Sequence, residues 1–306
     1  MMQTIKILFI GGLLLIISGC DKVVEKGVMQ SDISKDVELV TDFGTIVMRL
    51  SDETPKHRNN FIKLVNEKFY DGIAFHRIIE NFLIQTGDVE TKVVEASEDF
   101  DASKFIYEID AEIRSNLLHK RGAINAARLG DDQNPNRSSS GTQFTIIQGK
   151  VYNDSLLDLS ENRINTWLAF NKVINKPENS NAFKKYFKIA TKLEDIYNNT
   201  DKNHTNRETI KVLEDSLLVF KSTFDSLAVI ELASMKAYKY PESYRKIYKT
   251  IGGAAHLDQN YTVFGNVVKG MDIVDSIAAV KTNKQDKPIN EVRIISAKMI
   301  KRKTYN

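Results

Sequence analysis

The chain has 306 residues, of which 42% are hydrophobic and 27% are charged, and its formal net charge at pH 7 is +3. This length allows one large domain or two smaller ones, and the composition excludes a disordered or fibrous protein. The small net charge argues against nucleic acid as a partner, and the single cysteine excludes an intramolecular disulfide.

The first twenty residues have the pattern of an exported lipoprotein. Lys6 precedes an unbroken apolar run over residues 7–17, and the string ISGC then ends at Cys20. The run is too short to cross a bilayer, which takes about 20 residues, but it has the length of a signal-peptide hydrophobic region. ISGC resembles the bacterial lipobox, so we expect residues 1–19 to be a lipoprotein signal peptide and Cys20 to carry a lipid anchor. The alternatives are an ordinary secretory signal or a buried N-terminal helix.

Residues 20–36 carry many charges and show no clear period, which predicts a flexible tether. No later segment is apolar enough to span a membrane, so we expect the rest of the chain to be soluble. Together these features predict a cell-envelope protein that Cys20 holds on the periplasmic or surface side of a bacterial membrane.

Short strand-like runs dominate the next part of the chain. Residues 37–40 and 45–50 are apolar runs around a turn sequence, and they predict a β-hairpin. Thr54 and Pro55 predict the start of a helix. The buried face of this helix would hold Phe61, Leu64 and Val65. Further short strands follow, and many strands with few helices predict a closed β-barrel or a sandwich.

Residues 149–250 break this pattern, because no glycine lies between Gly149 and Gly252. Apolar residues recur here at helical spacing. They are Ile164, Trp167 and Leu168, then Phe183, Tyr186, Phe187, Ala190, Leu193 and Tyr197, and finally Ile210, Leu213, Leu217, Phe220, Phe224 and Leu227. We therefore predict a helical insertion about the size of a small domain, packed as a separate unit. Its aromatic residues are interpreted as its core, with a ligand groove as the alternative.

Three ordered blocks of the β-rich part carry a further signal. They are FYDGIAFHRIIENFLIQTGD at residues 69–88, HKRGAINAARLG and SGTQFTII at 119–130 and 140–147, and HLDQNYTVFGNVVKGMDIVDSIA at 256–278. In order and content these blocks resemble the cyclophilins, a family of peptidyl-prolyl cis/trans isomerases. The resemblance covers about residues 37–148 and 251–300.

The resemblance implies a mainly β fold, with a closed antiparallel β-barrel capped by two helices. Residues 37–148 and 251–306 would form this cyclophilin-like domain, and residues 149–250 would be an insertion outside the resemblance. The implied reaction is rotation about X–Pro bonds of proline-containing polypeptides, against a barrier of ~18–20 kcal/mol. Such a rotation needs a surface that grips proline and a hydrogen-bond donor, so no cofactor or metal is expected.

By resemblance, Arg77 is the arginine that stabilises the twisted bond, and Gln85 and Gln143 hold this arginine and the substrate backbone. The implied catalytic residues are Arg77, Gln85 and Phe82. The implied substrate-binding residues are Leu83, Ala127, Arg128, Gln143, Thr145, Leu257, His256 and Tyr261.

Three positions depart from the family pattern. Thr145 stands where the family usually has a Phe or Tyr that forms the floor of the proline pocket, which predicts reduced turnover. His256 stands where several eukaryotic relatives carry a tryptophan, so cyclosporin sensitivity does not carry over from the resemblance. Ala255 replaces the usual proline just before it, which predicts a looser loop.

Two functions follow from these residues. The favoured one is an isomerase that assists the folding of exported proteins, because uncatalysed prolyl isomerisation takes tens to hundreds of seconds. The rival is a weakly active or inactive binding module, or a chaperone, that uses the helical insertion to hold a partner. Thr145 favours the rival, whereas Arg77, Phe82, Gln85 and Gln143 together favour the enzyme.

Overall fold

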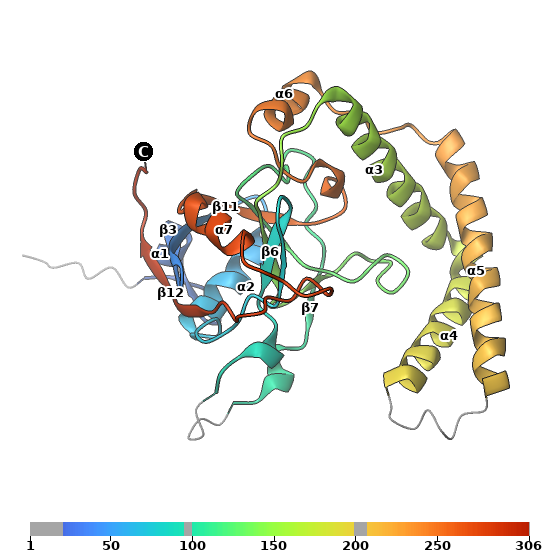
Figure 1. The fold of residues 1–306 in the computed structure, drawn as a ribbon, viewed down its shortest axis with the longest axis horizontal. Helices are drawn as coiled ribbons and strands as arrows, with labels where there is room; N and C mark the ends of the chain where they lie inside the picture. Colours follow the sequence, from blue (N-terminus) through green and yellow to red (C-terminus); the bar gives the residue numbers. More distant parts are fainter. Residues whose placement is uncertain (1–20, 95–99, 199–206, 306) are drawn as a thin grey trace, which may run out of the picture.

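The computed structural model describes residues 21–94, 100–198 and 207–305. Figure 1 shows a β-rich body formed by both ends of this range, with a group of long helices projecting from one side of it. The position of the predicted anchor, Cys20, lies outside the described residues. None of the described helices is long and apolar enough to cross a membrane.

An eight-stranded antiparallel sheet forms the β-rich body, in the order β12-β3-β4-β11-β8-β10-β6-β5. Its strands are β3 (Lys35–Thr41), β4 (Gly44–Leu50), β5 (Arg77–Ile79), β6 (Leu83–Thr86), β8 (Ala123–Ala126), β10 (Phe144–Ile147), β11 (Val263–Lys269) and β12 (Ile294–Lys301). The predicted hairpin is confirmed, since β3 pairs with β4 in antiparallel register. Two smaller pairs are β1 (Val23–Glu25) with β2 (Val28–Met29) and β7 (Glu108–Ile109) with β9 (Ser139–Ser140).

The expected full closure of the barrel is wrong, because the edge strands β5 and β12 do not pair with each other. The two edges are joined by a short stretch of backbone hydrogen bonds. The Gly72 amide donates to the Ile294 carbonyl and the Phe75 amide to the Val292 carbonyl, both at 2.8 Å. β5 is only three residues long and is followed by Asn81 in the left-handed region (φ 62°), so it is too short to extend this ladder. The sheet is therefore a curled one with a seam.

Two helices cover the sheet, as the resemblance implied: α2 (Pro55–Asn66) contacts β11 and β12, and α7 (Met271–Ala278) contacts β4, β5 and β6. The predicted inner face of α2 is buried in the main core, where Phe61 packs edge-on against Phe144 at 5.1 Å between ring centroids. Thr54 takes the N-cap position, but its hydroxyl makes no capping hydrogen bond. The carbonyl of Thr54 instead accepts from the Arg58 amide at 2.9 Å.

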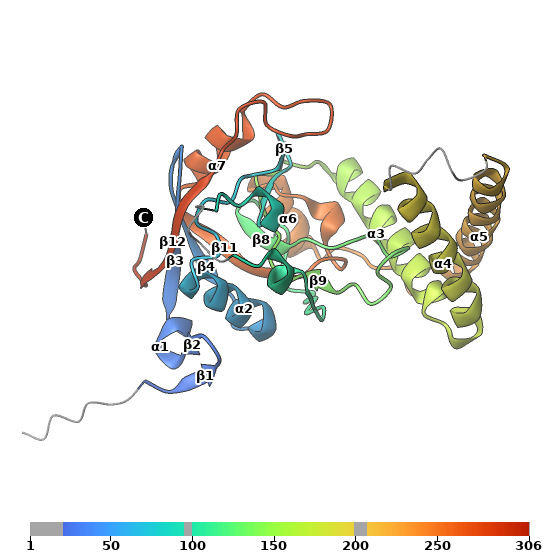
Figure 2. The same ribbon diagram turned by 90° about the horizontal axis from the view of Figure 1, so that it is seen from below.

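The segment before β3 differs from the expected flexible tether. Residues 23–33 form β1, β2 and the short helix α1 (Gln30–Ile33), which lie beside β3 and α2 in Figure 2. The side chain of Val28 is buried in the main core. The amide of Asn66 on α2 donates to the Gly27 carbonyl at 3.0 Å and to the Asp32 carboxylate at 3.2 Å. These contacts fold the segment onto α2.

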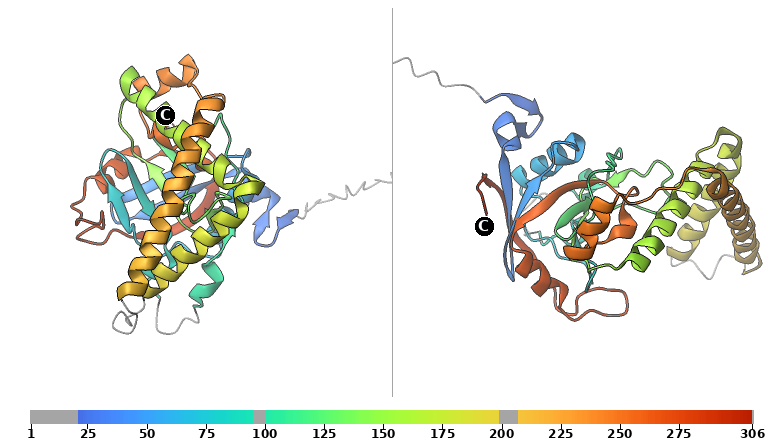
Figure 3. Two further views of the ribbon diagram at one scale, coloured as in Figure 1. Left: turned by 90° about the vertical axis from the view of Figure 1, so that its right-hand side faces the viewer. Right: turned by 90° about the horizontal axis from the view of Figure 1, so that it is seen from above.

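The middle of the chain is helical, as its apolar spacing predicted. Its helices are α3 (Asp154–Ile174), α4 (Ser180–Asn198), α5 (Arg207–Ser234) and α6 (Glu242–Thr250). Short 3-10 turns are η1 (Val89–Thr91), η2 (Ala102–Phe105), η3 (Pro177–Asn179) and η4 (Ala255–Leu257). The far end of this region has its own core, in which Phe183 and Tyr186 of α4 pack on Phe224 of α5. Figure 3 shows α4 and α5 on the side away from the sheet.

The near end of the helical region shares a core with the barrel, which differs from the expected separate packing. Leu118 and Ala255 of the barrel cluster with Leu157 and Tyr248 of α3 and α6. A buried carboxylate adds polar links, because Asp258 accepts hydrogen bonds from the hydroxyls of Tyr240 at 3.0 Å and Tyr248 at 2.6 Å.

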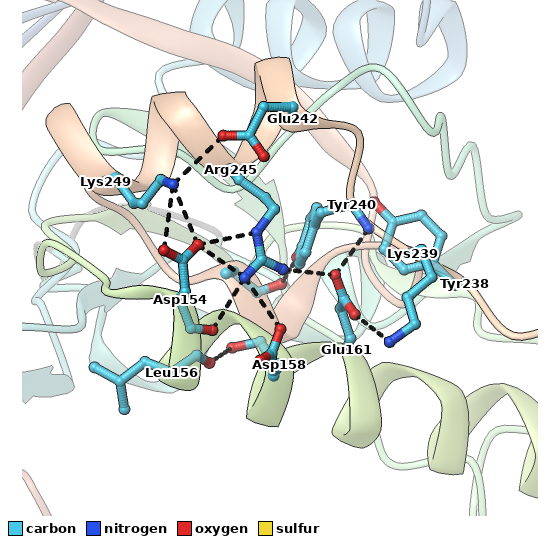
Figure 4. Close-up of polar contacts among 12 residues, drawn as sticks. Asp154, Leu156, Asp158, Glu161, Tyr238, Lys239, Tyr240, Glu242, Arg245 and Lys249 are labelled. Carbon is cyan, nitrogen blue, oxygen red and sulfur yellow. Dashed lines mark hydrogen bonds and ion pairs between the residues drawn. The ribbon is translucent and has the colours of Figure 1, made fainter.

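Ion pairs fix α6 onto the first turns of α3 (Figure 4). The guanidinium of Arg245 donates to the carboxylates of Asp154 at 2.9 Å, Asp158 at 3.0 Å and Glu161 at 3.0 Å. Glu161 is buried and also accepts from the Tyr240 amide at 3.0 Å. Hydrogen bonds to a charged group are stronger than neutral ones, so α3 is held in a defined place beside the sheet.

Candidate functional site

Strand pairing places three polar side chains in a row. Arg77 on β5 lies opposite Gln85 on β6, and its Nη1 donates to the Gln85 Oε1 at 3.5 Å. The Nε2 of Gln85 donates to the Oε1 of Gln143 at 3.1 Å. The Arg77 side chain is 40% exposed, and its Nε lies 3.5 Å from the Asp286 carboxylate. The guanidinium is thus oriented by neighbours on two sides while it remains open to a ligand.

An apolar cluster lies next to this row, because alternate residues of a strand share a face. Leu83 and Gln85 are two residues apart on β6, so they face the same side of the sheet. Leu83 belongs to a cluster of buried and partly buried apolar residues that also includes Phe82, Leu257 and Tyr261. Four residues of the predicted proline site therefore come together in the structure.

His256 packs against Phe82, with 5.3 Å between ring centroids and an interplanar angle of 34°. Burial, and then the positive charge of Arg163, lower the pKa of His256 to about 4. The ring is therefore uncharged near neutral pH and acts as a flat packing surface for Phe82 rather than as a proton carrier.

Thr145 lies between Gln85 and Asn125 in the strand register. Its side chain is 4% exposed, and its hydroxyl donates to the Oδ1 of Asn125 at 2.6 Å. The position predicted as the floor of the proline pocket is therefore part of an internal hydrogen bond and offers no aromatic face.

Ala127 and Arg128 line a cavity of about 600 Å³ together with Gln85 and Gln143. The Arg128 side chain is only 4% exposed and pairs with Asp131 at 2.7 Å. Its guanidinium also lies 4.6 Å from the centre of the Tyr261 ring. The charge of Arg128 is thus paired inside the protein.

Two residues of α3 reach the site and were not among the predicted site residues. Trp167 belongs to the same apolar cluster as Leu83 and Leu257, and Arg163 lies above the Trp167 ring at 4.6 Å. Their helical spacing indicated only a core position. The one useful signal was that the insertion leaves the barrel after Ile147 and returns just before His256, so both of its ends lie at the site.

Within residues 21–94, 100–198 and 207–305, no three His, Cys, Asp or Glu side chains gather where they could hold a metal ion. The candidate site thus consists of a polar row, an apolar cluster and a neighbouring cavity.

A comparison with known families decides what this arrangement belongs to. A family model described as cyclophilin type peptidyl-prolyl cis-trans isomerase/CLD matches residues 36–213 and 234–299, well over half of the chain. The chain belongs to this family. The resemblance and the expected enzyme class are thereby confirmed, and the activity of this cyclophilin at the family level is peptidyl-prolyl cis/trans isomerisation.

Named relatives agree with this assignment. A Staphylococcus saprophyticus protein named "Putative peptidyl-prolyl cis-trans isomerase" is 23% identical over 251 residues, which are 82% of this chain and 84% of the relative. The Schizosaccharomyces pombe peptidyl-prolyl cis-trans isomerase ppi1 is 39% identical over 113 residues, 36% of this chain and 66% of the relative. A crystal structure of a Cryptosporidium parvum cyclophilin type isomerase aligns with 88% of this chain and 99% of its own, at 15% identity and a TM-score of 0.46.

The matched range runs across residues 149–213, which include α3 and α4. The near end of this helical region also shares a core with the barrel.

Proposed function

We propose that this cyclophilin catalyses rotation about X–Pro bonds in exported polypeptides, with Arg77 as the residue that stabilises the twisted bond. The observation that supports this role is the row formed by Arg77, Gln85 and Gln143 beside the apolar cluster of Leu83 and Leu257. The row supplies hydrogen-bond donors, and the cluster supplies a surface for the proline ring.

The chemistry of the reaction fits this pair of features. The X–Pro bond resists rotation because amide resonance gives the C–N bond partial double-bond character. In the twisted state the nitrogen regains its lone pair, and a fixed N–H donor then binds it better than it binds the planar amide. Arg77 presents its N–H donors in a rigid planar fork, and Gln85 restricts the position of this fork.

The test is the catalytic efficiency, kcat/KM, on a short proline peptide. Arg77→Ala should lower kcat/KM by ~100-fold or more, since it removes the donor. Arg77→Lys should recover little of the loss, because a lysine lacks the planar fork. The matched control is Arg207→Ala, an exposed arginine at the start of α5. An Arg77→Ala variant as active as the control would contradict the proposed role.

We further propose that Cys20 anchors the protein to a bacterial membrane, where it would meet exported chains. The support is the apolar run that ends in ISGC. Cys20→Ser should release the protein from washed membranes or block its processing. Unchanged retention together with unchanged processing would exclude the anchor.

A second function, the holding of partially folded clients, is favoured by one observation on α5. Val212, Val219 and Ile230 lie at spacings of 7 and 11 residues, so they share one face of the helix, and all three are exposed. Val219→Asp with Ile230→Asp should leave peptide isomerisation unchanged and weaken the suppression of aggregation of an unfolded protein. Equal suppression by the variant and the parent would remove the support for this function.

A further inference from the structure

We propose that Trp167, on helix α3 of the insertion, forms an aromatic wall of the proline pocket and contacts the substrate. The insertion would then supply part of the binding site of the enzyme instead of standing beside it. This inference rests on the proposed isomerase function and names an additional substrate-binding residue for it.

The contacts of Trp167 place it at the pocket. It packs in the same apolar cluster as Leu83, Leu257 and Tyr261, which come from β6, η4 and the loop before β11. Its ring lies 6.5 Å from the ring of Tyr261 at an interplanar angle of 67°. The Trp167 side chain is partly buried, so part of the indole remains accessible beside these pocket residues.

Several bonds hold Trp167 in this place. Arg137 donates from Nη2 to the Trp167 carbonyl at 3.0 Å, and Arg163 lies over the indole at 4.6 Å. Two residues earlier on α3, the side-chain amide of Asn165 donates to the Tyr238 carbonyl at 3.0 Å and its Oδ1 accepts from the Tyr238 amide at 2.7 Å. The indole is therefore preorganised, so binding a ligand against it costs little ordering of the side chain.

The pocket lacks an aromatic floor at the position where the family usually has one. Thr145 is buried and its hydroxyl is bonded to Asn125, so it gives a proline ring no flat surface. Arg163 lies over the Trp167 indole, and Trp167 lines a cavity of about 270 Å³ together with Arg128 and Tyr261, two residues of the predicted substrate site. A proline ring is apolar and compact, and burial against an aromatic face stabilises it.

The competing explanation is that Trp167 only packs α3 onto the barrel. Both explanations predict that the loss of the indole lowers stability, so stability does not separate them. Only the substrate-contact explanation predicts that peptide binding changes the environment of the indole. It also predicts that loss of the indole raises KM while kcat stays nearly unchanged.

The chain contains one tryptophan, so fluorescence excited selectively at tryptophan, and not at the tyrosines, reports on Trp167 alone. A proline peptide without Trp or Tyr should change the emission of the full chain in a saturable way, with a midpoint near the KM of isomerisation. Trp167→Ala should raise KM about tenfold with kcat within about twofold, because the lost contact is made to the ground state and transition state alike. Trp167→Phe should recover most of the affinity.

Phe187→Ala is the matched control, because Phe187 is an aromatic residue of the same insertion that is 43% exposed on α4. It should leave KM unchanged. Peptide turnover without any change in emission, or a folded Trp167→Ala variant with unchanged or lower KM, would overturn the inference. If Trp167→Ala fails to fold, the wild-type fluorescence titration and the Trp167→Phe variant still decide it.

The two proposals fail in different ways. Peptide that binds with an emission change but is not isomerised would contradict the proposed function and support the contact with Trp167. Isomerisation that depends on Arg77 but leaves the emission unchanged would contradict the contact alone. Absence of peptide binding would contradict both.

Discussion

At the scale of single residues, Thr145 has a role that differs from the one expected at its position in the family. The hydroxyl of Thr145 donates to the buried Asn125, so the residue stabilises the pairing of β8 with β10. An unsatisfied buried acceptor costs about 1–3 kcal/mol. Thr145 therefore stabilises the sheet, whereas an aromatic floor of the proline pocket was expected at this position.

Thr145→Val tests this interpretation, since valine keeps the shape and removes the hydroxyl. We expect the free energy of unfolding to fall by about 1–2 kcal/mol, because the Asn125 oxygen loses its partner. We expect kcat/KM to stay within about twofold, because the hydroxyl faces Asn125. Urea unfolding and a peptide assay measure the two quantities. A large loss of activity at unchanged stability would show that the hydroxyl contacts the substrate instead.

His256 predicts a dependence of stability on pH. Its pKa is about 4 in the folded protein against an ordinary 6.5, because burial and Arg163 disfavour the charged ring. Between these two values the unfolded chain binds a proton that the folded chain does not, so the free energy of unfolding falls as the pH falls from 6.5 toward 4. Well above pH 6.5 the ring is uncharged in both the folded and the unfolded chain, so His256 adds no pH dependence to the free energy of unfolding there.

His256→Asn should therefore reduce the loss of stability between pH 7 and pH 5. Part of the loss should remain, because burial also lowers the pKa values of His57 and His76. Urea unfolding at the two pH values, for the parent and the variant, gives the comparison. An identical loss in both proteins would show that His256 titrates normally in the folded state.

At the scale of elements, the local sequence pattern correctly predicted individual helices and one hairpin. The β3–β4 hairpin, the buried face of α2 and the helices between Gly149 and Gly252 all follow from periodicity within short windows. The contacts that join α3 and α6 to the barrel were not predicted. Asp258 and Tyr248 are ten residues apart, and His119 joins the same carboxylate from 139 residues away, so no window contains the group.

This shared core leads to a prediction about deletions. Removal of residues 150–250 should abolish cooperative unfolding, because it exposes Leu118 and Ala255 and takes two hydroxyl donors from Asp258. Asp258 is 1% exposed, and the deletion would leave its Oδ2 atom without a donor, which is unfavourable for a buried carboxylate.

The matched deletion removes only residues 176–236, with a flexible linker between α3 and Tyr238. This variant should still unfold cooperatively, since α4 and α5 pack against each other and the far end of α3, away from the core that α3 and α6 share with the barrel. Thermal unfolding followed by circular dichroism compares the two deletions. A stable, cooperative protein without residues 150–250 would show that the insertion is independent of the barrel.

At the scale of the whole molecule, the family was evident from the sequence blocks, whereas the arrangement of the site was only partly evident. The blocks placed Arg77, Gln85 and Gln143 correctly beside one another, because they lie on paired strands. The ion pair of the Arg128 side chain and the approach of Trp167 depend on Asp131 and α3, which lie outside the three sequence blocks. The blocks alone therefore did not predict these two features.

In the proposed mechanism, Arg77 acts on the rotation of the bond and not on the binding of the peptide. Exchange spectroscopy of a labelled X–Pro peptide at saturating enzyme measures the cis–trans interconversion rate on the protein, and a titration measures the dissociation constant. We expect Arg77→Ala to lower the interconversion rate by ~100-fold or more while the dissociation constant changes by less than about threefold. An unchanged interconversion rate with a raised dissociation constant would contradict this role of Arg77.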